Sequence, residues 1–155
     1  MKRSRFALLV AGFGAAGLAA ALPAQQGQQA APTRVIVYKT PTRGCCTAWV
    51  QYMRGAGFQV EARDVSDDEL QTVAMQSGVP GQLESCHTAQ VGGYVVEGHV
   101  PAEDVRRLLR ERPAVIGIAV PGMPAGSPGM ESGRPQPYQV IAFAQGGRTS
   151  VFAQH

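Results

Sequence analysis

Short apolar runs typical of β-strands, either continuous or alternating with polar positions, recur from residue 34 to residue 153. The first run, Val35–Tyr38, is continuous and indicates a buried strand, whereas Phe58–Val65 alternates apolar with polar positions as a half-buried strand does. Two pairs of runs flank glycine-containing turns, at Gly92-Gly93 and at 145–148, and each pair predicts a β-hairpin. The predicted strands cover residues 34–40, 58–65, 88–91, 94–97, 115–120, 139–144 and 149–153.

Helical spacing of apolar residues separates several of these strands. The first predicted helix covers residues 44–56. Its sheet-facing side holds Cys46, Trp49, Val50 and Met53. The run Ser66–Glu69 fits a capping box, which opens a second helix that ends at Ser77-Gly78, and a third helix covers residues 102–112. The resulting order, β-α-β-α-β-β-α, resembles the thioredoxin-like α/β fold, and the chain continues into a C-terminal β extension.

The first 24 residues have the pattern of a secretory signal peptide. Lys2, Arg3 and Arg5 form a basic start, and a run rich in alanine and glycine follows over Phe6–Leu22. An uncleaved membrane anchor is the alternative, although the run is short for a membrane span. Residues 25–33 are rich in glutamine and alanine and predict a flexible leader, so the folded domain is expected over 34–155, in the periplasm.

The charge of the chain depends on that first segment. There are 14 Lys and Arg residues against 11 Asp and Glu residues, a net charge of +3. Three of the basic residues are Lys2, Arg3 and Arg5, which leaves 11 basic and 11 acidic residues after cleavage. We therefore expect no nucleic-acid partner, and no membrane association once the signal peptide is removed.

Two adjacent thiols, Cys45 and Cys46, lie where the first predicted strand gives way to the first helix. A helix N-terminus favours anions and lowers the pKa of a thiol, and the thiolate is both nucleophile and metal ligand. In a thioredoxin-like fold the segment before the hairpin, here Cys86-His87, passes close to that N-terminus. We therefore predict that three sulfurs and the His87 nitrogen converge. The alternatives are a disulfide from Cys86 to Cys45 or Cys46, and Cys46 as a plain core residue.

The remaining candidates are methionines and histidines outside that cluster. Met123 and Met130 lie in a loop rich in glycine and proline, where they would either close over a soft metal or fill gaps in the packing. Thiolates and thioethers select copper(I), while imidazole and thiolate together also suit zinc. His99 is expected to mark the start of a helix, and His155, at the end of the chain, is expected to have no part in the site.

Four motifs in the predicted domain resemble domain-of-unknown-function family 411, the family of CopG-like metal-resistance proteins. These motifs are Tyr38–Cys46, Ser85–Ala89, Gly92–Pro101 and Val120–Glu131. The resemblance implies a periplasmic, thioredoxin-like protein that binds copper through its cysteines, with other copper-handling proteins as partners. The metal positions carried over by motif are Cys45, Cys46, Cys86 and His87, with Met123 and Met130 as weaker candidates.

One position departs from the family pattern. The family usually has Cys-Gly-Cys-Cys at this loop, and here Arg43 takes the first position. Positions 43 and 46 have the spacing of a C-x-x-C redox pair, which Arg43 cannot complete, and a cation there should also lower the thiol pKa and repel a metal. We therefore expect a binding protein for copper(I). A thioredoxin-type or copper-linked oxidoreductase that uses Cys46 and Cys86, and a structural protein with one disulfide, are the alternatives.

Overall fold

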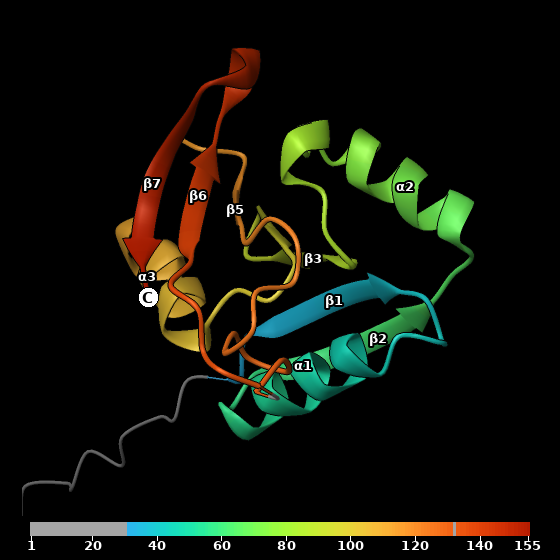
Figure 1. The fold of residues 1–155 in the computed structure, drawn as a ribbon. Coiled ribbons are helices and arrows are strands. Elements are labelled where there is room, and N and C mark those ends of the chain that lie inside the picture. Colours follow the sequence, from blue (N-terminus) through green and yellow to red (C-terminus); the bar gives the residue numbers. More distant parts are fainter. Residues whose placement is uncertain (1–30, 132) are drawn as a thin grey trace, which may run out of the picture. The chain divides into compact units, whose positions relative to one another are not determined.

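The computed structural model describes residues 31–131 and 133–155, which form one compact unit (Figure 1). The signal peptide and most of the leader expected over residues 1–33 lie outside the described residues. The strands are β1 (Arg34–Lys39), β2 (Gln59–Asp64), β3 (His87–Val91), β4 (Tyr94–Glu97), β5 (Gly117–Ala119), β6 (Gln139–Phe143) and β7 (Thr149–Gln154). The α-helices are α1 (Gly44–Gly55), α2 (Asp67–Gln76) and α3 (Ala102–Glu111), and single 3₁₀ turns cover Gly81–Leu83 and Gln145–Gly147.

All seven strands belong to one mixed sheet with the order β2-β1-β3-β4-β5-β6-β7. The β1–β2 and β4–β5 pairs are parallel, and the other four pairs are antiparallel. The chain crosses from β1 to β2 through α1 and from β4 to β5 through α3. The C-terminal extension predicted from the sequence therefore widens the same sheet by three strands.

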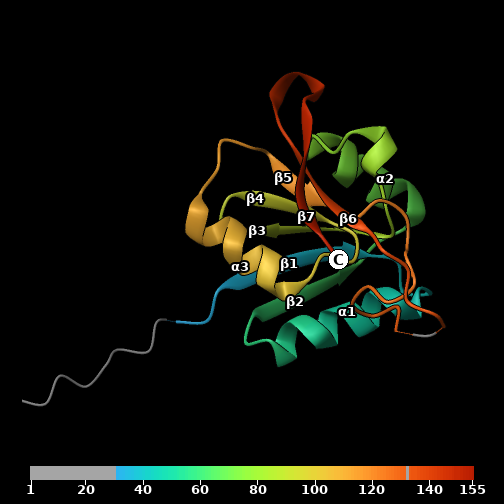
Figure 2. The same cartoon turned by 60° about the vertical axis from the view of Figure 1, so that its left-hand side comes forward.

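Side chains on the two faces of the sheet form two separate cores. On one face, Trp49 and Met53 of α1 and Leu108 of α3 pack against strand residues such as Val37 and Ile118. On the other face, α2 covers only part of the sheet, where the second core contains Ala74, Val79, Leu83, Val95, Ala119 and Phe143. Figures 1 and 2 show α2 on the side of the sheet away from α1. On that second face, the part of the sheet over β1, β3 and β4 beside α2 stays partly open.

The mixed α/β class and the order of the elements agree with the sequence analysis. The capping box of α2 is present, because the Ser66 hydroxyl accepts the Glu69 N–H and the Glu69 carboxylate accepts the Ser66 N–H. The predicted strand over 115–120 is shorter, because the Val115 N–H donates to the Pro113 carbonyl and turns the backbone before β5 begins. Within the described residues, no helix has the length and apolar character that a membrane span requires.

Candidate metal centre

The pairing of β1 with β3 brings distant cysteines to one place. Lys39, the last residue of β1, is opposite His87, the first residue of β3. Since β1 leads into α1, this register puts Cys86 beside the first turn of α1, where Cys45 and Cys46 lie. The sequence-based expectation that two segments 40 residues apart meet at this helix N-terminus therefore has a direct origin in strand register.

Four donor atoms converge at this point. The sulfurs of Cys45, Cys46 and Cys86 and one ring nitrogen of His99 all lie within 4.8 Å of one another. The Cys45 and Cys46 sulfurs are 3.9 Å apart, and the Cys86 sulfur is 2.9 Å from His99 Nε2. All three cysteines are free thiols in this structure. The cluster therefore offers three sulfur donors and one nitrogen donor to a single ion.

His99 reaches the cluster through the β3–β4 hairpin. Thr88 pairs with Glu97 in that hairpin, and extending the register by two residues puts Cys86 opposite His99. The His99 Nδ1–H donates to the Pro128 carbonyl at 2.7 Å, which leaves Nε2 facing Cys86. The sequence analysis assigned His99 to the start of a helix. The signal that could have identified it is the predicted hairpin itself, because its Gly92-Gly93 turn already implies this pairing.

His87 is outside the four-donor set, although it touches Cys86. Its ring is completely buried against Trp49, with the ring centroids 4.4 Å apart, and its Nδ1 is 3.3 Å from the Cys86 sulfur. Burial lowers the pKa of His87, so the ring is held neutral. Its Nε2 has no hydrogen-bond partner. This fits a neutral ring that donates Nδ1–H to the Cys86 sulfur and keeps Nε2 unprotonated.

Cys86 is the thiol that this environment favours as a thiolate. The Cys46 thiol and both histidine rings lower the pKa of Cys86 through contacts with its sulfur, and these contacts outweigh the opposing effect of burial. The interaction with Cys86, together with burial, raises the pKa of Cys46. Burial alone would lower the pKa of His99, but the contact with Cys86 raises it. These shifts favour a thiolate at Cys86 and a thiol at Cys46, and they favour the protonated form of His99 more than burial alone would allow.

The loop over residues 121–130 packs directly on the cluster. A Cβ on Gly129, at φ +87°, would lie 2.8 Å from the Cys45 carbonyl oxygen and 3.3 Å from His99 Nδ1. Met123 contacts the cluster, since its Sδ is 3.9 Å from the Cys45 sulfur. Met130 is half-buried in the same loop, and among the described residues its sulfur makes no hydrogen bond to the cluster. The loop therefore supplies one thioether at the edge of the cluster.

Arg43 forms an ion pair, and His155 a hydrogen bond, with acidic residues away from the cluster. The guanidinium of Arg43 is 3.7 Å from the carboxylate of Asp67, the first residue of α2. His155 Nε2 is 2.7 Å from the Asp104 carboxylate on α3. The charge of Arg43 is therefore shared with an acidic partner that the sequence analysis did not anticipate.

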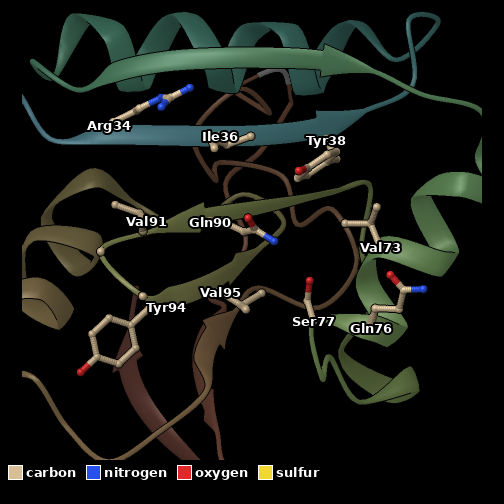
Figure 3. Close-up of a pocket in the computed structure, with 12 residues that line it drawn as sticks. Arg34, Ile36, Tyr38, Val73, Gln76, Ser77, Gln90, Val91, Tyr94 and Val95 are labelled. Atoms are coloured by element: carbon tan, nitrogen blue, oxygen red, sulfur yellow. The ribbon is translucent and has the colours of Figure 1, made fainter.

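A cavity of about 630 Å³ lies on the partly open face of the sheet, away from the cluster (Figure 3). Ile36 and Tyr38 of β1 and Val73 of α2 point into it, and it contains none of the cysteine or histidine side chains. Ile36 alternates along β1 with Val35 and Val37, which belong to the α1 face. The cavity and the Cys/His cluster are therefore on opposite faces of the sheet, and the metal-binding side chains belong to the cluster.

The donor set defines what the cluster can bind. Thiolates and a thioether are soft ligands that suit copper(I), and a set of three cysteines and one histidine is also a known tetrahedral zinc environment. The hydrogen bond that orients His99 and the buried surroundings are typical of a prearranged metal site. The residues therefore fit a soft or borderline metal ion.

Comparison with known proteins gives the family. The family described as "Protein of unknown function, DUF411" matches residues 83–130, which include Cys86 and His99. Two solved structures named copper resistance protein copG, forms 2 and 1, are 43% and 42% identical, each with a TM-score of 0.74. Each match covers 80% of this chain and 98% of the other. No curated protein matches the chain. The chain belongs to the CopG-like DUF411 family.

Proposed function

We propose that this protein is an exported copper(I)-binding protein that sequesters or transfers copper in the periplasm and so acts in copper resistance. The observation that carries the proposal is the convergence of Cys45, Cys46, Cys86 and His99 within 4.8 Å. The similarity to proteins named for copper resistance supports copper as the ion. We further infer that the domain is thioredoxin-like, with partners among other copper-handling proteins.

The thioether at the edge of the cluster indicates that the ion handled here is copper(I) and not zinc. Met123 Sδ lies 3.9 Å from the Cys45 sulfur, and thioethers bind soft copper(I), whereas protein zinc sites use cysteine, histidine and carboxylate ligands. His87 stays within contact of the Cys86 sulfur, where its Nδ1–H stabilises the thiolate ligand. We therefore assign the ligand role to the three cysteines and His99, and a supporting role to His87.

Anaerobic titration with copper(I) in competition with a chromophoric chelator tests the proposal. Cys86→Ser removes the central thiolate and is expected to lower copper(I) affinity by at least about 100-fold. Circular dichroism of the metal-free variant shows whether the fold is retained. Unchanged copper(I) affinity and stoichiometry in both Cys86→Ser and Cys45→Ser would refute the assignment of these ligands. Preferential binding of zinc(II) over copper(I) would show that zinc, and not copper, is the ion of this site.

A thiol–disulfide oxidoreductase is the second candidate. It is favoured by the closeness of the Cys46 and Cys86 sulfurs and by the lowered pKa of Cys86, which provides a nucleophilic thiolate. Reduction of insulin disulfides and a defined two-electron midpoint for a Cys46–Cys86 pair would support it. Absence of both, with tight copper(I) binding, leaves the binding function alone.

A further inference from the structure

The donors of the cluster differ strongly in their access to solvent. Cys46, Cys86 and His99 are buried, each with 1% or less of its surface exposed. Cys45 is half-buried, and Met123 has 47% of its surface exposed. Cys45 and Met123 are also in contact with each other through their sulfurs, 3.9 Å apart. An ion that approaches the cluster from solvent therefore meets these two sulfurs first.

The loop that carries Met123 packs against residues of the cluster and its neighbours on both sides of Met123. Gly129 lies against the backbone of Cys45 and Trp49, closely enough that an added Cβ would be 2.8 Å and 2.9 Å from their atoms. Near the other end of the loop, the Ser85 hydroxyl donates to the Gly122 carbonyl at 2.5 Å. Contacts on both sides of Met123 therefore fix the loop against Cys45, Trp49 and Ser85, with the Met123 side chain left exposed.

We propose that Met123 and Cys45 form the port through which copper(I) is loaded and released, with Met123 as a transient ligand. The inference rests on the proposed copper function. A thioether is soft, neutral and free of a proton, so it binds copper(I) at any pH and releases it more readily than a thiolate does. These properties suit a ligand that passes the ion onward.

The partner implied by this port presents copper(I) on soft sulfur ligands of its own. As the ion moves inward, a bond from copper to a partner sulfur breaks while a bond to Met123 forms, and the copper–Met123 bond in turn breaks as bonds to Cys45 and the buried cysteines form. Copper stays in the +1 state, and the thiol protons of the cysteines leave to solvent when the thiolates bind. No oxidant or reductant takes part.

Met123→Leu, which keeps the size and removes the sulfur, tests the port in the full chain. Loading from the copper(I)–bicinchoninate complex and unloading to excess bicinchoninate are followed anaerobically by stopped-flow absorbance. A transient ligand lowers the barrier in both directions, so both rates are expected to fall about tenfold in the variant while equilibrium affinity changes little. Met75→Leu, at an exposed methionine on α2, controls for loss of a surface thioether.

The unloading rate decides the outcome. A slower unloading rate in Met123→Leu, with Met75→Leu at the wild-type rate, supports the port. An unchanged unloading rate overturns it, and a faster one also overturns it, because that result identifies Met123 as a resident ligand. If the wild-type chain takes up no copper(I) at all, the proposed copper-binding function is refuted together with the port. If the wild-type chain binds copper(I) but the unloading rate of Met123→Leu is unchanged or faster, only the port is refuted.

Discussion

The two ring nitrogens of His99 have different partners, and this difference prepares the residue for metal binding. Nδ1–H donates to the Pro128 carbonyl, while Nε2 faces the Cys86 sulfur at 2.9 Å. The same contact with Cys86 raises the pKa of His99 against the effect of burial. A metal ion therefore has to displace a proton from His99 at mildly acidic pH.

This competition predicts that His99 contributes to the pH dependence of copper(I) affinity. Below the raised pKa of His99, copper(I) affinity should fall more steeply as pH falls, because the His99 proton adds about tenfold per pH unit to the fall caused by the Cys46 thiol proton that binding also displaces. Cys86 should add nothing to this slope, because its pKa is lowered well below the range concerned. In His99→Gln, affinity should be lower and the slope between pH 5 and pH 6.5 smaller by about one proton.

Copper(I) competition titrations across that pH range measure the slope. His155→Gln provides the matched histidine control, because His155 pairs with Asp104 and not with the cluster. Equal slopes for the wild type and His99→Gln would exclude His99 as the group that exchanges its proton for the metal.

At the scale of elements, local signals in the sequence predicted most of the fold. The Ser66–Glu69 capping box marked the start of α2, and the Gly92-Gly93 pair marked the turn between β3 and β4. The positions of Cys45 and Cys46 followed from the strand-to-helix junction. These features depend on neighbouring residues, so a single sequence is enough to find them.

Features that depend on contacts between elements were harder to predict. His99 has no local pattern that distinguishes a ligand from a residue at the start of a helix, and only the β3–β4 register brings it to Cys86. The ion pair of Arg43 with Asp67 joins two elements through side chains alone, so the spacing of residues along the sequence does not predict it. The contact of Met123 with Cys45 depends on the conformation of an irregular loop, and the periodicity of apolar residues does not predict loop conformation.

At the scale of the whole molecule, the C-terminal strands are part of the domain and not an appendage. Phe143 of β6 is completely buried in the second core, and Val140 on the same strand belongs to the first. The strand thus contributes to the cores on both faces of the sheet. We therefore expect the described unit to unfold as a single cooperative structure.

Phe143→Ala tests this cooperation. Loss of a fully buried aromatic side chain should lower the free energy of unfolding by about 3–5 kcal/mol. Urea unfolding followed by circular dichroism should show one transition, shifted to a lower midpoint. Val151→Ala, at a half-exposed position on the neighbouring β7, should change the free energy of unfolding by about 0.5 kcal/mol or less. A small effect of Phe143→Ala, or two separate transitions, would show that the hairpin opens independently.

The packing of Trp49 against His87 has a practical consequence. The chain contains one tryptophan, and its ring lies 4.4 Å from the ring that contacts the Cys86 sulfur. Its fluorescence therefore comes from a single, buried indole next to the place where an ion would settle. Emission from this indole should change when the cluster is filled, so that occupancy can be followed optically in unlabelled protein.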